Sequence, residues 1–360
     1  MRGVGAPAES GRPPRPACDN RVTMRLDDRF DDLVTSLGGF YRAWVIQLGL
    51  ELELFAALRA AGPQGLSPVE LAAATTTNAD QIIAWCRAAY ACDLVDDDGQ
   101  RLHVDEGTAS ILLDVDRPEY LGGQFAYTVT ASLDYADMAQ LLRTGRTIAV
   151  RPPRYYRSIE QLTRQDIAVF FEEALAAMPD LVTLLAGGAD VIDLHCGGGR
   201  WLAAVARRFP AARLVGVESE PDSTARAMRL VQEAGLESRI HIEAREVATI
   251  THDAAFDLAY FQHALHEHPD PAAALKAAWR ALRPDGWLLV LGWCLPSSLD
   301  DLATLHGQLI TGVALDEALN GGRLRTVEEH ALLFEAAGLP APRAISLPSD
   351  ATLLIVQQSA

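Results

Sequence analysis

The sequence lacks an excess of positive charge. Its 31 lysine and arginine residues are outnumbered by 48 aspartate and glutamate residues, so the formal net charge is −17. A protein that binds nucleic acid or an anionic membrane needs a basic surface to face the phosphates. The composition therefore argues against both partners and favours a small molecule as the ligand.

Long apolar runs and patterned cysteines are missing as well. No apolar run is long enough to cross a membrane. The cysteines have no metal-type spacing, and an odd, unpatterned set is typical of free thiols in a reducing compartment. We therefore expect a cytoplasmic protein. The five cysteines are Cys18, Cys86, Cys92, Cys196 and Cys294.

The first 25 residues are rich in proline, glycine and arginine. They lack the apolar stretch of a signal peptide, and we expect residues 1–25 to be a disordered tail. Met24 is an alternative start residue. The length that remains, more than 330 residues, is typical of two domains rather than one.

The segment after the tail has the pattern of a small helical domain. Residues 40–58 place apolar side chains at helical spacing. Ser67 and Glu70 form a capping box at the start of a second helix, and Asn78 is in the capping position of a third. The Asp-Gly pair at 98–99 is typical of a tight hairpin. Three helices followed by a hairpin predict a winged helix-turn-helix.

A winged helix often binds DNA, but this one lacks the residues for it. The candidate recognition helix lies within residues 78–95 and carries a single basic residue, Arg87. A DNA-reading helix needs arginine, lysine or asparagine facing phosphates and base edges. We therefore interpret residues 26–115 as a dimerisation domain and expect a homodimer. A winged-helix regulator that senses a ligand is the alternative.

The rest of the chain divides into a helical connector and an α/β domain. Residues 116–185 are predicted to be helical and are rich in aromatic side chains, some of which we expect to line a pocket for an apolar, ring-shaped ligand. Across residues 186–360, apolar strand-like runs alternate with helical stretches, which predicts a doubly wound, mostly parallel α/β sheet. The strand-like runs are residues 191–194, 213–217, 239–243, 256–261, 287–293 and 352–357.

Three consecutive glycines follow the first of these strands, in the segment VIDLHCGGGRWL (191–202). Glycine is required where backbone approaches a ligand closely or adopts positive φ. Glu218 ends the next strand, where a carboxylate accepts hydrogen bonds from ribose hydroxyls. A dinucleotide fingerprint would need a further glycine at the position of Leu202. The turn therefore predicts a nucleotide cofactor other than NAD or FAD.

These motifs resemble the class I S-adenosylmethionine-dependent methyltransferases. Residues 256–290 resemble the family's fourth strand, following helix and fifth strand, and residues 318–339 resemble a stretch of small-molecule O-methyltransferases whose N-terminal half dimerises. The resemblance implies a seven-stranded Rossmann-like sheet, S-adenosylmethionine as cofactor, and a cofactor site formed by the motif residues. These are Asp193, His195, Gly197 and Gly199 in the glycine turn, Glu218 at the ribose, and Glu246 near the adenine.

His195 is the departure from the family pattern, because it stands where the family has its first glycine. One interpretation is that the position merely tolerates a side chain. The other is an altered cofactor geometry, which keeps open an enzyme that binds the cofactor but performs non-methylating chemistry. Asp193 is interpreted as orienting the loop and the amino group of the cofactor, or as a carboxylate that only caps the turn.

Methyl transfer to a hydroxyl needs alignment and a base that removes the hydroxyl proton. Histidine suits this role because its pKa lies near neutrality. In the segment HALHEHP (263–269), which follows the fourth strand, His266 aligns with the family's catalytic histidine and is followed by an acid, Glu267. We predict both as catalytic residues.

Four further polar positions have weaker claims. His263 and His268 are explained equally well as part of a solvated loop. A metal held by the three histidines is a minority alternative, because no carboxylate–cysteine pattern completes a site, and we predict no metal. Asn320 is a candidate substrate contact or a turn residue, whereas Glu329 is explained by a capping box with Thr326. The sequence as a whole predicts an O-methyltransferase acting on a small aromatic metabolite.

Overall fold

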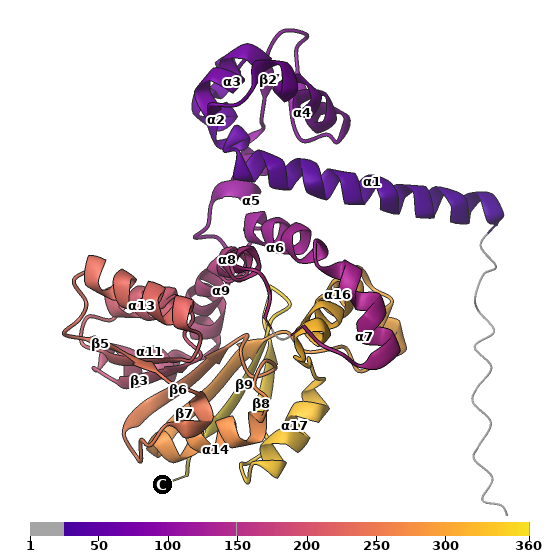
Figure 1. The fold of residues 1–360 in the computed structure, drawn as a ribbon. Helices are drawn as coiled ribbons and strands as arrows, with labels where there is room; N and C mark the ends of the chain where they lie inside the picture. The colour runs from indigo at the N-terminus through magenta and orange to yellow at the C-terminus, as the bar shows by residue number, and fades with distance from the viewer. Residues whose placement is uncertain (1–24, 149, 360) are drawn as a thin grey trace, which may run out of the picture.

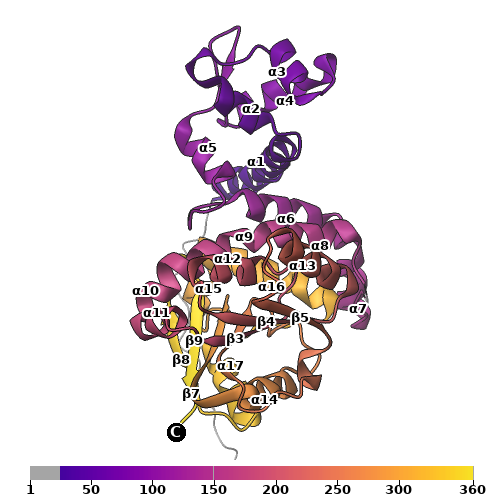
Figure 2. The same ribbon diagram turned by 90° about the vertical axis from the view of Figure 1, so that its left-hand side faces the viewer.

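The computed structural model describes residues 25–148 and 150–359. The tail expected at residues 1–25 lies almost entirely outside the described residues. Figure 1 shows a small helical part stacked above a larger α/β part, with the long helix α1 extending sideways from the junction. The view turned by 90° in Figure 2 shows the same two parts one above the other.

The N-terminal part consists of helices and one short hairpin. Ser67 and Glu70 form the predicted capping box, and the Asn78 side chain accepts hydrogen bonds from two backbone N–H groups of its helix. The predicted hairpin is confirmed as an antiparallel pair, β1–β2. The elements are α1 (Leu26–Glu51), α2 (Leu54–Ala61), α3 (Pro68–Thr75), α4 (Ala79–Ala91), β1 (Asp96–Asp97), β2 (Leu102–His103) and α5 (Glu106–Leu113).

The expectation of one helical pattern across residues 40–58 is corrected by the structure. The chain turns at Glu53, whose φ of 58° lies in the left-handed region. The turn lets Leu54 and Phe55 enter the core of the N-terminal part, where the Phe55 ring packs edge-on against Trp85. Burial of these side chains outweighs the continuation of a helix that apolar spacing alone favours.

Helices also fill the segment between the two parts, as predicted for residues 116–185. Figure 1 shows α6, α8 and α9 between the N-terminal part and the sheet. The helices are α6 (Gly122–Ser132), α7 (Met138–Thr144), α8 (Pro153–Leu162), α9 (Arg164–Val169), α10 (Leu175–Ala177) and α11 (Pro179–Ala186).

The C-terminal part is built on a seven-stranded sheet of order β5-β4-β3-β6-β7-β9-β8. The five strands from β5 to β7 are parallel, and β9 is antiparallel to both β7 and β8. This confirms the predicted doubly wound α/β class. The strands are β3 (Asp190–Leu194), β4 (Arg213–Glu218), β5 (Ile240–Ala244), β6 (Phe256–Gln262), β7 (Leu282–Gly292), β8 (Arg343–Ser346) and β9 (Thr352–Gln357).

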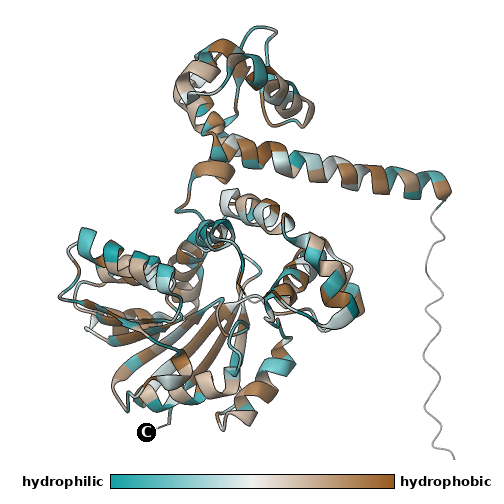
Figure 3. Ribbon diagram, in the orientation of Figure 1, coloured by the Kyte–Doolittle hydropathy of each residue, from teal (hydrophilic) through white to brown (hydrophobic). Residues whose placement is uncertain are grey.

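Helices cover both faces of this sheet, and its central strands are mainly hydrophobic, as Figure 3 shows. In β3, Val191 packs with α11, α12 and α13 on one face, whereas Ile192 packs with α14 and α17 on the other. Such near-continuous apolar strands are typical of parallel sheets buried on both sides. The helices are α12 (Arg200–Arg208), α13 (Pro221–Glu233), α14 (Pro271–Ala281), α15 (Leu299–Leu302), α16 (Leu305–Asn320) and α17 (Val327–Ala336).

A buried polar network joins the connecting helices to α16. The Asp316 carboxylate is fully buried and accepts hydrogen bonds from the hydroxyls of Tyr127, at 2.6 Å, and Tyr155, at 3.0 Å. Arg151 donates to the same carboxylate at 3.3 Å and to Asp134 at 2.9 Å. The network therefore fixes α16 against α6 and α8. Among the described helices, none is long and apolar enough to span a membrane.

Removal of the Asp316 carboxylate is expected to destabilise the protein strongly. Asp316→Ala would leave the buried Arg151 guanidinium without its main counter-charge, and breaking a buried ion pair costs about 3–5 kcal/mol in the free energy of unfolding. Denaturant unfolding followed by circular dichroism measures this loss. The control is Asp253→Ala, an exposed position where a change within about 0.5 kcal/mol is expected. Equal stability of the two variants would contradict the role of the network.

Candidate functional site

A cavity of about 460 Å³ lies beside the carboxyl ends of β3, β4 and β6. From β3 the chain adds β4 and β5 on one side and then continues with β6 and β7 on the other, so the strand order reverses between β3 and β6. Ligands bind at such a point in open α/β sheets. One side of the cavity is formed by loops that follow these strands, and the opposite side by residues of α8, α9 and α16. The site therefore lies between the sheet and the helical connector.

The glycine turn after β3 forms the first half of the cavity. Gly197 has a φ of 53°, and a Cβ atom built on it would meet no heavy atom within 4 Å. Glycine at this position therefore leaves open space beside the backbone, which a close-fitting ligand can occupy. Gly199 is the N-cap of α12 and packs against Ala227 of α13 instead of lining the cavity.

Glu218 binds the glycine turn to the end of β4. One of its carboxylate oxygens accepts a hydrogen bond from the Gly197 N–H at 2.9 Å, and the other accepts one from the Glu220 N–H at 2.8 Å. The side chain is almost fully buried but lines the cavity. Because each carboxylate oxygen has a second acceptor site, Glu218 retains the capacity to accept hydrogen bonds from a ligand.

His195 lines the cavity. Its φ of 78° lies in the left-handed region that favours glycine. Its Nε2 atom lies 3.5 Å from a carboxylate oxygen of Glu267 and 4.0 Å from one of Glu218. Burial alone would lower the pKa of His195, but the carboxylates of Glu218, Glu267 and Asp193 outweigh burial and raise it. The imidazole thus connects the glycine turn with the second half of the cavity.

The two other acids predicted for the cofactor differ in their positions. Asp193 is buried at the end of β3 and lines the cavity, and burial raises the pKa of its carboxyl to about 8. Glu246 is exposed at the start of a short 3-10 turn and does not line the cavity. The structure therefore brings Asp193 to the site but not Glu246.

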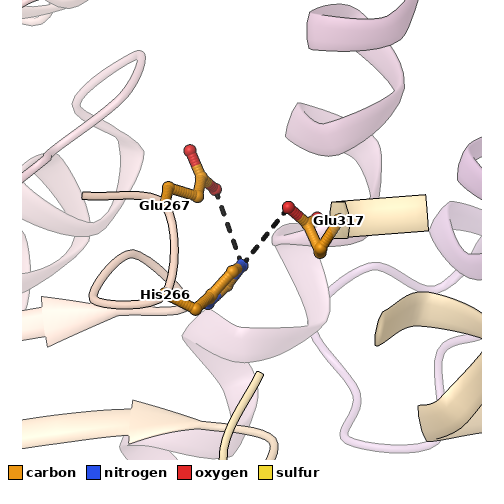
Figure 4. Close-up of side chains that lie close together, drawn as sticks. All are labelled: His266, Glu267 and Glu317. Carbon is orange, nitrogen blue, oxygen red and sulfur yellow. Dashed lines mark ion pairs between the residues drawn. The ribbon is translucent and has the colours of Figure 1, made fainter. Parts of the chain in front are cut away.

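The second half of the cavity centres on His266, in the loop after β6. Figure 4 shows the carboxylates of Glu267 and Glu317 on two sides of the imidazole. The His266 Nε2 atom lies 3.6 Å from an oxygen of Glu317 and 3.9 Å from one of Glu267. Burial would lower the pKa of His266, but Glu317 and Glu267 outweigh burial and raise it. Glu317 therefore joins the predicted pair of His266 and Glu267 as a third polar group at this point.

Glu317 is the site residue that sequence analysis missed. It belongs to α16, far along the chain from His266, and is 5% exposed. Its Oε2 atom has no hydrogen-bond partner within the described residues. Two adjacent acids, Asp316 and Glu317, in an otherwise apolar helix were the available signal, because buried acids in such a setting need partners.

The histidines of this loop do not converge on one point. His263 faces Asp166, with 3.3 Å between Nε2 and Oδ1. His268 is half-buried near Phe261, and desolvation lowers the pKa of His268 to about 4. In the described part of the chain, the one group with metal-type spacing is His266, Glu267 and Glu317. A three-histidine metal site is therefore not formed, whereas a cation of some kind would fit between these three side chains.

Asn320 lines the cavity, but its amide is already bonded within the protein. Its side-chain nitrogen donates to the Tyr155 hydroxyl at 2.9 Å, and its side-chain oxygen accepts from Arg151 at 3.1 Å. Asn320 thus extends the buried network of Asp316 to the cavity wall. Glu329 forms the capping box expected from sequence with Thr326.

Comparison with known sequences connects this geometry to a class of enzymes. Residues 191–286 match the family model described as a methyltransferase domain. Trans-aconitate 2-methyltransferase of Deinococcus radiodurans is 34% identical over 104 residues, which are 28% of this chain and 37% of that protein. Ubiquinone biosynthesis O-methyltransferase of Xylella fastidiosa is 33% identical over 103 residues, 29% of this chain and 41% of that one. The chain spans less than half the length of the curated relatives it matches.

Solved structures match over the whole fold. Human N-acetylserotonin methyltransferase in complex with SAM has a TM-score of 0.72 at 18% identity, covering 93% of this chain and 99% of that one. The mitomycin 7-O-methyltransferase MmcR has a TM-score of 0.68 at 20% identity, covering 92% and 98%. Residues 191–286 are therefore similar to a methyltransferase domain. The fold of the chain, including the N-terminal helical part, is the one seen in these solved methyltransferase structures.

Loss of the Glu218 carboxylate is expected to weaken cofactor binding by about 1.5–3 kcal/mol, the value of hydrogen bonds to a charged group. Titration calorimetry with S-adenosylhomocysteine measures the dissociation constant of Glu218→Ala against the natural protein. Glu246→Ala is the matched control, because Glu246 is exposed and outside the cavity. NAD is expected to give no binding heat. An unchanged dissociation constant in Glu218→Ala would remove Glu218 from the site.

Proposed function

We propose that the protein transfers a methyl group from S-adenosylmethionine to a hydroxyl of a small aromatic metabolite, with His266 as the general base. The observation that carries this proposal is the position of His266, which faces the cavity opposite the glycine turn and lies between two carboxylates. A base in this position is within reach of an acceptor that shares the cavity with the cofactor.

The residues of the first half of the cavity fit the cofactor. Gly197 leaves the backbone open to a ligand, and Glu218 retains acceptor sites for ribose hydroxyls. When bound, S-adenosylmethionine supplies a methyl group that is already activated on a sulfonium sulfur. The contribution expected from the chain is alignment of the two ligands, exclusion of water and removal of one proton.

His266 takes the proton of the acceptor hydroxyl, and the nearby carboxylates stabilise the imidazolium that results. Glu317 and Glu267 each lie within 4.0 Å of the imidazole, so the positive charge forms next to negative groups. These carboxylates also raise the pKa of His266, which makes the imidazole a stronger proton acceptor.

The walls around His266 support an aromatic acceptor. The cavity that His266 faces has apolar side chains in its walls, and apolar walls bind planar rings while a few polar groups fix their orientation. The apolar and aromatic lining residues include Ile148, Tyr156, Ile159, Leu162, Trp293, Val313 and Leu324.

Substitution of His266 by alanine is expected to lower kcat by about 10²–10⁴-fold, the contribution of a positioned base. The dissociation constant for S-adenosylhomocysteine should barely change. In the natural protein, activity should fall as pH drops through the raised pKa of His266, because the protonated imidazole accepts no proton, and this acid limb should be absent from the variant. His268→Ala, in the same loop, is the control and should cost far less. Near-full activity of His266→Ala would reject the base.

A second candidate function is favoured by one observation, the position of His195. Its imidazole lies 3.5 Å from Glu267, so it faces the acceptor half of the cavity from the cofactor side. We propose, as the alternative, an enzyme that binds the cofactor and performs non-methylating chemistry at this point. Cofactor binding without methyl transfer to any member of a phenol panel would favour this alternative.

We also propose that the protein is a homodimer. Helix α1 carries an exposed apolar stripe at helical spacing, and a stripe of this size on one long helix is typical of an interface. It is formed by Leu26, Phe30, Leu33, Leu37, Phe40 and Tyr41.

Light scattering at micromolar concentration is expected to give twice the 38.9 kDa mass of the chain. The double variant Leu33→Asp, Leu37→Asp should shift the mass toward the monomer, since charges in the centre of an apolar interface are costly. Thr35→Asp, away from the stripe on the same helix, should stay dimeric. A monomeric natural protein would contradict the dimer.

A further inference from the structure

We infer that the acceptor molecule carries a basic nitrogen that is protonated on binding and pairs with the carboxylate of Glu317. This inference rests on the proposed function, because it assigns a substrate class to the same cavity. The class is a phenol with an alkylamine side chain, or a hydroxylated nitrogen heterocycle with a basic nitrogen.

The first step is the environment of Glu317. Its side chain is buried, its Oε2 atom has no hydrogen-bond partner in the described part of the chain, and it lines the cavity. The helix that carries it is held in place, because the adjoining Asp316 accepts hydrogen bonds from Tyr127 and Tyr155. A carboxylate fixed in a buried position without a partner is costly unless a ligand supplies the missing positive charge.

The second step is that no positively charged side chain is left to pair with Glu317 when His266 is neutral and ready to accept a proton. Within the described ranges, His266 is the one basic side chain within 4.0 Å of Glu317. A general base must be neutral to accept a proton, so His266 cannot neutralise Glu317 before the reaction. Glu267 has a second basic neighbour besides His266, because the His195 Nε2 atom lies 3.5 Å from its carboxylate.

The arginines that line the cavity are committed elsewhere. Arg151 pairs with Asp134 and Asp316. The two others, Arg200 and Arg226, both pair with Glu160 near the glycine turn. The arginines that line the cavity therefore offer no partner to Glu317, and a cationic acceptor would complement its charge.

The third step distinguishes an organic cation from a metal ion. Histidine ligands of metals almost always donate their other ring nitrogen to a protein group, which fixes the imidazole. Over residues 25–148 and 150–359, neither the His266 imidazole nor the Glu317 carboxylate has a side-chain hydrogen bond of this kind. A dedicated metal site would have this support, whereas an ammonium group brings its own three donors. The apolar walls also suit the ring to which such a nitrogen is attached.

The test uses three phenols of similar size that differ in charge: tyramine, 4-ethylphenol and 3-(4-hydroxyphenyl)propionate. Calorimetry with protein saturated by S-adenosylhomocysteine measures their dissociation constants. We expect tyramine to bind at least about tenfold more tightly than 4-ethylphenol, and the propionate to bind more weakly than both. Equal binding of tyramine and 4-ethylphenol, or tighter binding of the propionate, would overturn the inference. This comparison uses the natural protein and needs no variant to fold.

The Glu317→Gln variant then assigns the preference to this side chain. The ratio of the two dissociation constants should fall to about one, whereas Glu335→Gln, exposed on α17, should keep the ratio of the natural protein. A preference that persists in Glu317→Gln would overturn the assignment. The same would follow if EDTA abolished the preference, or if Zn²⁺ bound with a stoichiometry of one in a Glu317-dependent manner, because the partner of Glu317 would then be a metal.

Failure of the proposed function has a different signature. If tyramine binds preferentially but is not methylated, the cationic ligand stands and the methyl-transfer proposal falls. If phenols are methylated with equal preference for neutral and cationic members, methyl transfer stands and the cationic acceptor falls.

Discussion

The buried pairing of Asp316 with Arg151 is the interaction on which the site depends. A fully buried carboxylate and a nearly fully buried guanidinium are kept together by two tyrosine hydroxyls and a second acid, so neither charge is left without partners. The pair joins α16 to the helices that separate the N-terminal part from the sheet. Because Glu317 and Asn320 are on the same helix, their positions at the cavity follow from this contact. The sheet alone supplies only half of the site.

The other half follows from the topology of a parallel sheet. Strands β3, β4 and β6 end at one edge, and each contributes one chemical function there: backbone in the glycine turn, a carboxylate in Glu218 and an imidazole in His266. These groups lie close together because the parallel strands end at the same edge of the sheet, although the groups are up to about seventy residues apart in sequence. The helical connector forms the opposite side of the cavity and contributes apolar side chains to its walls.

Much of this arrangement was predictable from sequence, because the relevant signals are local. Alternating apolar runs predicted strands, and the capping boxes at Ser67 and Thr326 predicted helix starts. The glycine turn and Glu218 predicted residues that form one half of the cavity. Strand β8 was missed because it is short, mostly exposed and held at the sheet edge only by pairing with β9. The break at Glu53 was missed because tertiary burial of Phe55, not local preference, turns the chain there.

The position of Glu317 shows where sequence patterns stop being informative. An acid in a helix is ordinarily a solvated residue, and only the packing of α16 across the cavity turns it toward His266. Glu246 shows the reverse case, because a matching motif predicts it near the adenine, whereas its side chain is exposed and does not line the cavity. Local patterns predict elements, whereas contacts between distant elements decide which polar side chains face the cavity.

The alternation of acids and imidazoles from Glu218 through His195, Glu267 and His266 to Glu317 has a thermodynamic consequence. Successive members lie between 3.5 and 4.0 Å apart, so a change of charge at one end alters the protonation of the next. In the proposed mode of binding, cofactor and acceptor contact opposite ends of this row, and their binding free energies would therefore be coupled. Such coupling is reciprocal: the factor by which one ligand changes the affinity of the other is the same in both directions. The row of charges thus connects the two halves of the cavity electrostatically.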